Sequence, residues 1–201
     1  MELWSVKDGA ITGTTTASAE DPTKGSLKHN TFLIWRGGVV KDFELTLKYR
    51  IVAGNSGIQY RSKELDAGPQ GPVLSGYQAD FEAGTKYSGI LYEEKARGIL
   101  ALRGESVTIT DSEDPKKPTL TKGEPAGDSG AIQAAIKSED WNDYKIIAKG
   151  GHLQHFINGM KTVDVKDEST AGAKEGLLGL QIHTGPPMVV QFKDLILKTL
   201  E

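Results

Sequence analysis

Apolar and polar residues alternate along several short segments of the chain. Between Asp42 and Val52 every second residue is apolar, and the intervening residues are charged or carry a hydroxyl. A period of two places the apolar side chains on one face of a strand and the polar ones on the other. The same alternation over residues 57–62 and 77–82 predicts two further half-buried strands.

The second half of the chain has apolar segments separated by tight-turn signals. Residues 144–148 and 152–157 are joined through Gly150-Gly151, and Asn158-Gly159 follows as a strong hairpin signal. Residues 177–183 and 188–197 predict a closing pair of strands, with Gly185-Pro186-Pro187 between them. No stretch has a clear helical period of apolar residues.

Two long polar stretches, near residues 14–29 and 111–129, interrupt this pattern. The second contains three prolines and lies between strands of the same character, which indicates a surface loop rather than a linker. The chain has 201 residues and 24 glycines. We therefore predict an all-β protein: one sandwich domain over residues 1–201, built from two antiparallel sheets.

Composition narrows the possible partners. The net charge is −3 and no basic patch stands out, so we expect no nucleic-acid partner. There is no cysteine, which excludes disulfides and thiol chemistry. No apolar run approaches the roughly 20 residues that a membrane span needs, so we expect no membrane-spanning segment. The first residues show no signal-peptide pattern.

The strands carry phrases by which the chain resembles the 3-keto-disaccharide hydrolase family. The resemblance covers nearly the whole chain, and the phrases agree in order and spacing. They are Trp4–Gly13, Asp42–Leu45, Gly54–Ser62, Gly76–Asp80, Gly89–Glu94, Arg97–Ala101, Trp141-Asn142, Ile157–Gly159 and Gly179–His183, with the final strand Phe192–Leu200.

This resemblance implies a concanavalin A-like jelly roll with a carbohydrate ligand. Some members of the family cleave glycosides whose sugar has been oxidised to a ketone at C3. The resemblance also implies a bacterial protein in the periplasm or outside the cell. A fold of this type hosts lectins and glucanases as well, so function has to be argued from the site.

The first candidate site residues lie on the polar face of the predicted strands. These are Gln59, Arg61, Gln78, Asp80 and Glu82. Asp80 and Glu82 share a face about 6.5–7 Å apart, which is compatible with a glycosidase pair. Jelly-roll glucanases place a glutamate nucleophile where this chain has Gln78, and an amide cannot serve as that nucleophile. We therefore expect Asp80 and Glu82 to bind ligand rather than act as nucleophile and acid.

Histidines and aromatic residues supply the other candidates. His183 shares a strand face with Gln181, and His155 precedes a predicted hairpin; either could act as a base near neutral pH. Elimination beside a C3 ketone needs a base, an oxyanion stabiliser and an acid. We assign the base to His155 or His183, the stabiliser to Arg61 with Gln181, and the acid to Asp80 or Glu93. Tyr92 is the expected groove residue for stacking.

Two other functions stay open on the sequence. The same face could belong to a non-catalytic carbohydrate-binding module, or to a glucanase that uses Asp80 and Glu82. Asp111, Glu113 and Asp114 could hold calcium in a loop, but an EF-hand pattern is absent and a solvated acidic loop is the commoner case. We expect no cofactor.

Overall fold

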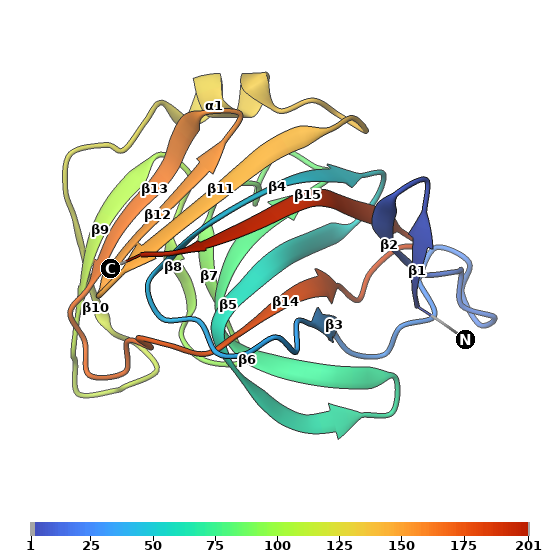
Figure 1. The fold of residues 1–201 in the computed structure, drawn as a ribbon, viewed down its shortest axis with the longest axis horizontal. Coiled ribbons are helices and arrows are strands. Elements are labelled where there is room, and N and C mark those ends of the chain that lie inside the picture. The colour runs from blue at the N-terminus through green and yellow to red at the C-terminus, as the bar shows by residue number, and fades with distance from the viewer. Residues whose placement is uncertain (1–2, 201) are drawn as a thin grey trace.

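The computed structural model describes residues 3–200 as two sheets that face each other (Figure 1). The larger sheet has nine strands. In spatial order they are β1 (Trp4–Lys7), β2 (Ala10–Thr14), β15 (Val189–Thr199), β4 (Phe43–Ile51), β11 (Asn142–Lys149), β12 (His152–Ile157), β13 (Met160–Asp167), β9 (Glu105–Thr110) and β10 (Thr119–Lys122).

The smaller sheet has six strands. In spatial order they are β3 (Thr31–Ile34), β14 (Leu177–Ile182), β5 (Asn55–Gly68), β6 (Gly71–Glu82), β7 (Leu91–Glu94) and β8 (Gly98–Ala101). All pairings between these named strands are antiparallel except that of β9 with β13, which is parallel. The prediction of an all-β jelly-roll sandwich is confirmed.

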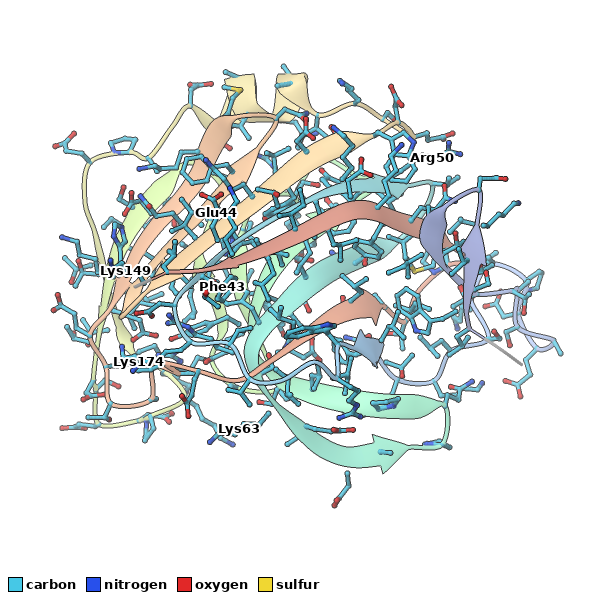
Figure 2. All side chains as sticks on the ribbon, viewed as in Figure 1. Phe43, Glu44, Arg50, Lys63, Lys149 and Lys174 are labelled. Carbon is cyan, nitrogen blue, oxygen red and sulfur yellow. The ribbon has the colours of Figure 1, made fainter. Side chains whose placement is uncertain are left out.

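The alternating segments form the strands expected of them. β4 alternates strictly between buried and half-buried residues from Phe43 to Ile51. Its buried residues point between the sheets, where they pack against Tyr60 and Tyr77 of the smaller sheet in one apolar cluster. Figure 2 shows side chains filling the space between the two sheets. Burial of this face drives the strand to one register, since a slip of one residue would expose it.

The turn signals are also confirmed. Asn158 and Gly159 adopt positive φ angles of 49° and 81°, as a two-residue hairpin turn between β12 and β13 requires. The Asn158 side chain donates to Ala135 O and accepts from Asp143 N, so it fixes the turn as well as tolerating its backbone. These contacts account for asparagine at this position.

The structure differs from the sequence expectation in the stretch 111–135. It contains the edge strand β10 and the helix α1 (Ser129–Ala135), neither of which was predicted. The helix has seven residues and one buried residue, Ile132, so it is too short to show an apolar period. Its start is set by Asp128, whose side chain accepts a hydrogen bond from Ala131 N.

Candidate functional site

A cavity of about 880 Å³ lies on the outer face of the six-stranded sheet, the face turned away from the other sheet. Side chains from β6 and β7 form its floor, and the segments around residues 30, 83–87 and 183–186 form its walls. The residues that could carry chemistry are Asn30, Asn55, Gln78, Asp80, Glu82, Tyr92, Glu94, Lys95 and His183.

Strand alternation brings these polar groups together. In β6 the residues Tyr77, Ala79 and Phe81 belong to the core between the sheets, so Gln78 and Asp80 point outward. The register of β6 with β7 pairs Gln78 with Tyr92. The face predicted for Gln78, Asp80 and Glu82 is therefore the face that bears the cavity.

Asp80 is a buried carboxyl in the cavity, only 6% exposed. Burial raises its pKa to about 8, and the nearby Glu82 carboxylate adds to the rise, while hydrogen bonds from Asn55 and Gln78 oppose it. Gln78 Nε2 donates to Asp80 Oδ1 at 3.3 Å. At neutral pH the Asp80 carboxyl is therefore mostly protonated and can give up a proton.

Glu94 is a second buried carboxyl in the cavity, 5% exposed. Burial raises its pKa, against the effect of a hydrogen bond from Asn30 and of the positive charge of Lys95. Asn30 Nδ2 lies 3.4 Å from both of its oxygens, and Gln181 Nε2 donates at 3.4 Å. Sequence reasoning missed Glu94, although alternation from Tyr92 would have placed it on the same face.

Gln181 is fully buried and joins the two carboxyls through Gln78. Its Oε1 accepts from Gln78 Nε2 at 3.4 Å, and its own amide donates to Glu94. Gly57, opposite Asp80 on β5, leaves room for this contact, since a Cβ there would lie 2.5–2.8 Å from the Gln78 side chain. Gln78 Oε1 has no hydrogen-bond partner within residues 3–200.

His183 lies on the cavity wall beside Thr184. Its Nδ1 makes a hydrogen bond with the backbone oxygen of Thr184. A carbonyl oxygen can only accept, so Nδ1 carries the hydrogen and Nε2 of the neutral ring is left as a base. Tyr92 also lines the cavity: burial raises the pKa of its hydroxyl, and Glu94 and Asp80 raise it further.

Glu82 lines the rim of the cavity, but its carboxylate is engaged. Its Oε1 accepts from the backbone amides of Lys86 at 2.6 Å and Tyr87 at 2.8 Å. These bonds hold the loop that follows β6. The arrangement favours a loop-fixing role for Glu82 over a catalytic pair with Asp80.

The structure places Gln59 and Arg61 outside the cavity. Gln59 shares the outer face with Gln78 but is fully buried, and its amide donates to Gly76 O at 3.1 Å. Arg61 has a φ of 46°, at a break in the register between β5 and β6, so the expected alternation stops before it. Its guanidinium donates instead to the backbone oxygens of Lys41, Gly150 and Ala173 and pairs with Asp42 at 2.9 Å.

Glu93 points to the opposite side of β7 from Tyr92 and Glu94. It pairs with Arg97, which also binds the buried Asp167 at 2.7 Å. Tyr77 donates to Asp167 as well, at 2.5 Å. Glu93 therefore belongs to an ion network between the sheets, away from the cavity.

His155 lies in the core between the sheets and is fully buried. Its Nε2 meets the Tyr60 hydroxyl at 2.9 Å, and burial lowers its pKa to about 3. It contacts Tyr144 edge-on and does not line the cavity. Of the two histidines predicted as a base, only His183 lies in the cavity.

Within residues 3–200 no group of three or more acidic or histidine side chains is placed to hold a metal ion. Asp111, from the acidic loop considered for calcium, accepts hydrogen bonds from the backbone and hydroxyl of Thr170 at 3.0 Å. Nor is any helix in that range long and apolar enough to cross a membrane.

Comparison with known proteins agrees with the resemblance described above. The family model of the 3-keto-alpha-glucoside-1,2-lyase-like domain matches residues 1–198, almost the whole chain. No curated protein sequence matches.

Solved structures with the same fold are distant in sequence. A proposed glycosyl hydrolase from Parabacteroides distasonis ATCC 8503 has a TM-score of 0.57 at 17% identity, covering 100% of this chain and 84% of that one. Carbohydrate-binding module CBM66 from Bacillus subtilis has a TM-score of 0.51 at 14% identity, covering 99% and 97%. A legume lectin-like domain from Entamoeba histolytica has a TM-score of 0.53 at 13% identity, covering 98% and 87%. At these identities the matches establish the fold alone.

Proposed function

The chain belongs to the 3-keto-alpha-glucoside-1,2-lyase-like family, and on that premise we propose that it cleaves 3-keto glycosides by elimination in the cavity on the six-stranded sheet. The observation that carries the proposal is that a candidate acid, Asp80, and a candidate base, His183, line the same cavity. By family resemblance we also propose a periplasmic or secreted location.

The reaction begins with removal of the proton on C2, which the ketone at C3 makes acidic. His183 Nε2 takes this proton, because Nδ1 is already committed to Thr184. The electron pair moves toward the ketone and forms an enolate. The Tyr92 hydroxyl, which lines the cavity and whose pKa is raised by burial and by Glu94 and Asp80, is the proposed donor to the enolate oxygen.

The bond between C1 and the leaving oxygen then breaks, and the enolate electrons form a C1–C2 double bond. Asp80 gives its proton to the leaving oxygen, which fits a pKa of about 8. Water adds to C1 and a proton returns to C2, so the net reaction is hydrolysis. Gln78 and Gln181 hold the two carboxyls in place but do not take part in proton transfer.

The test is cleavage of a methyl 3-ketoglucoside and of its parent glucoside, side by side in D₂O. Elimination followed by addition incorporates solvent deuterium at C2 of the product, whereas direct displacement at C1 does not. We expect turnover of the 3-keto compound alone, with deuterium at C2. Cleavage of both substrates without deuterium would overturn the mechanism and favour an ordinary glycosidase.

Two variants test the assigned roles. Asp80→Asn and His183→Gln should each lower kcat by about 10²–10⁴-fold, the usual contribution of a general acid or base. His152→Gln is the matched control, because His152 binds Asp164 on the other sheet and does not line the cavity. Unchanged turnover in both site variants would contradict the proposal. Saturable sugar binding without any turnover would favour a binding module.

A further inference from the structure

Asn30 joins two parts of the cavity wall, although it takes no part in the proposed proton transfers. It lies just before β3 and lines the cavity. Its Oδ1 accepts hydrogen bonds from Thr184 N at 2.9 Å and from the Thr184 hydroxyl at 3.3 Å. Its Nδ2 lies 3.4 Å from both carboxyl oxygens of Glu94. One side chain therefore ties the segment that follows β14 to β7.

The contacts with Thr184 bear on the proposed base. His183 Nδ1 donates to the backbone oxygen of Thr184. Asn30 holds Thr184 at its amide and at its hydroxyl, so Thr184 cannot rotate and carry that oxygen away from His183. A His183 ring without this acceptor can carry its hydrogen on either nitrogen. With the hydrogen on Nε2, that nitrogen is no longer a base.

The segment that carries Asn30 is anchored from its other side to the turn between β5 and β6. The backbone oxygen of Asn30 accepts from His29 Nδ1 at 2.9 Å, and His29 Nε2 accepts from Gln70 N at 3.2 Å. The Gln70 side chain accepts from Lys28 N at 2.6 Å and donates to Ser26 O at 3.1 Å. These bonds fix the backbone of Asn30, so its amide is a rigid support for Thr184.

We propose that Asn30 is the positioning residue of the base: it holds Thr184 so that the hydrogen of His183 stays on Nδ1 and Nε2 is free to take the C2 proton. This inference rests on the proposed function, in which His183 takes that proton. The orientation of the Asn30 amide follows from its partners. Thr184 N can only donate, so the amide oxygen faces Thr184 and the NH₂ group faces Glu94.

The experiment isolates the base step by hydrogen exchange. A 3-keto anhydroglucitol has no glycosidic oxygen at C1 to expel, so exchange of its C2 hydrogen in D₂O reports proton removal alone. We expect Asn30→Ala to lower the maximal exchange rate by about tenfold or more and to change KM by less than about threefold. Asn30→Asp keeps an acceptor for Thr184 N and should exchange several-fold faster than Asn30→Ala. An unchanged rate in Asn30→Ala would overturn the inference.

A double-mutant cycle tests whether Asn30 acts through His183. If it does, adding Asn30→Ala to His183→Gln should not lower the residual exchange rate further, because the base is already absent. Losses that multiply would contradict the inference. Asn158→Asp is the matched control, because it keeps the acceptor for Asp143 N, loses the donation to Ala135 O and lies outside the cavity. Its exchange rate should equal that of the wild type, and a loss as large as that of Asn30→Ala would also contradict the inference.

NMR of protein labelled with ¹⁵N-histidine detects the tautomer of His183 without any substrate. We expect the hydrogen on Nδ1 in the wild type and a mixture of both tautomers in Asn30→Ala. The hydrogen on Nε2 in the wild type would overturn the inference even if Asn30→Ala fails to fold. Wild-type exchange at C2 that does not depend on Asn30 refutes only this inference. A tautomer change in Asn30→Ala without any wild-type exchange refutes the proposed function and leaves the support of His183 by Asn30 standing.

Discussion

Gln78 and Gln181, which are 103 positions apart in the sequence, join their side-chain amides at 3.4 Å. Gln78 lines the cavity, whereas Gln181 is fully buried and does not. Gln78 also holds Asp80, and Gln181 also holds Glu94. The two buried carboxyls are thus connected through two amides, and the four residues lie on three strands, β6, β7 and β14. A substitution that moves either glutamine should therefore shift the positions of both carboxyls.

Gly57→Ala should impair the site without unfolding the protein. A Cβ at Gly57 would lie 2.5–2.8 Å from the Gln78 side chain, which must then shift and release Asp80 and Gln181. We expect about a tenfold or greater loss of kcat/KM with a modest change in unfolding free energy, measured by steady-state kinetics and urea denaturation. Gly123→Ala is the control, because a Cβ there meets nothing closer than 3.7 Å. Full activity in Gly57→Ala would contradict the role given to Gln78.

Asp80 should make both activity and stability depend on pH. Its folded pKa of about 8 lies above the ordinary value of 3.8 for an aspartate, so the folded state holds the proton more tightly. The stabilisation from this protonation is complete below pH 3.8 and is lost as the pH rises through 8. As the proposed acid, Asp80 should also make kcat/KM fall above pH 8.

Asp80→Asn separates these effects from the rest of the titration. Asparagine keeps the size of the side chain but has no proton to lose. The melting temperature of the Asp80→Asn variant should therefore fall less than that of the wild type between pH 5 and pH 9. Thermal unfolding across this range checks the expectation. Parallel curves for the two proteins would show that Asp80 ionises normally in the fold.

The sequence predicted the face of the site better than its residues. Alternation placed Gln78, Asp80 and Glu82 on one strand face, and all three line the cavity, because a regular strand preserves a period of two. The same period of two predicts that Arg61 shares this face. Its φ of 46°, at a break in the register between β5 and β6, turns its side chain away from the cavity. Nothing in the local pattern reveals such a bulge, since it depends on pairing with a partner strand.

The remaining errors come from contacts between distant segments. Asn30 reaches Glu94 from a long loop, and no local pattern in residues 14–29 predicts where that loop lies. His155 was assigned as a possible base because the sequence does not say which sheet face it occupies relative to the core. In the structure its partner is Tyr60, on the opposite sheet. Such pairings are properties of the packed sandwich.

His155 should matter for stability in acid rather than for catalysis. Its folded pKa of about 3 lies below the ordinary value of 6.5 for a histidine, so the unfolded chain takes up the proton first. The stabilisation is therefore present above pH 6.5 and is lost as the pH falls toward 3.

His155→Met leaves the Tyr60 hydroxyl unpaired and should cost about 1–3 kcal/mol at pH 7. The gap from wild type should narrow toward pH 4, because the variant has no histidine to protonate there. Urea denaturation at several pH values measures it, with His152→Gln as the control because His152 is partly exposed. A difference in unfolding free energy that stays constant with pH would contradict this structural role of His155. So would a loss of kcat in a variant that is fully folded.

Arg97 should be among the costliest single side chains to remove from the fold. Its own burial disfavours its charge, but the hydrogen bonds that it donates to Glu93 and Asp167 more than compensate, and the pKa of Arg97 is raised. Arg97→Met leaves both carboxylates buried without a cation, which typically costs about 3–5 kcal/mol. Arg36→Met breaks the exposed pair with Glu64 and should cost at most about 1 kcal/mol.

Denaturant titration of Arg97→Met and Arg36→Met measures this difference in unfolding free energy. The kinetics of Glu93→Gln tests whether Glu93 also takes part in catalysis. If Glu93 serves only the network with Arg97, Glu93→Gln should lower the unfolding free energy and leave kcat of the folded protein unchanged. A large loss of kcat in Glu93→Gln at full folding would return Glu93 to the list of catalytic residues. Similar costs for Arg97→Met and Arg36→Met would mean that the buried network contributes no more than a surface ion pair.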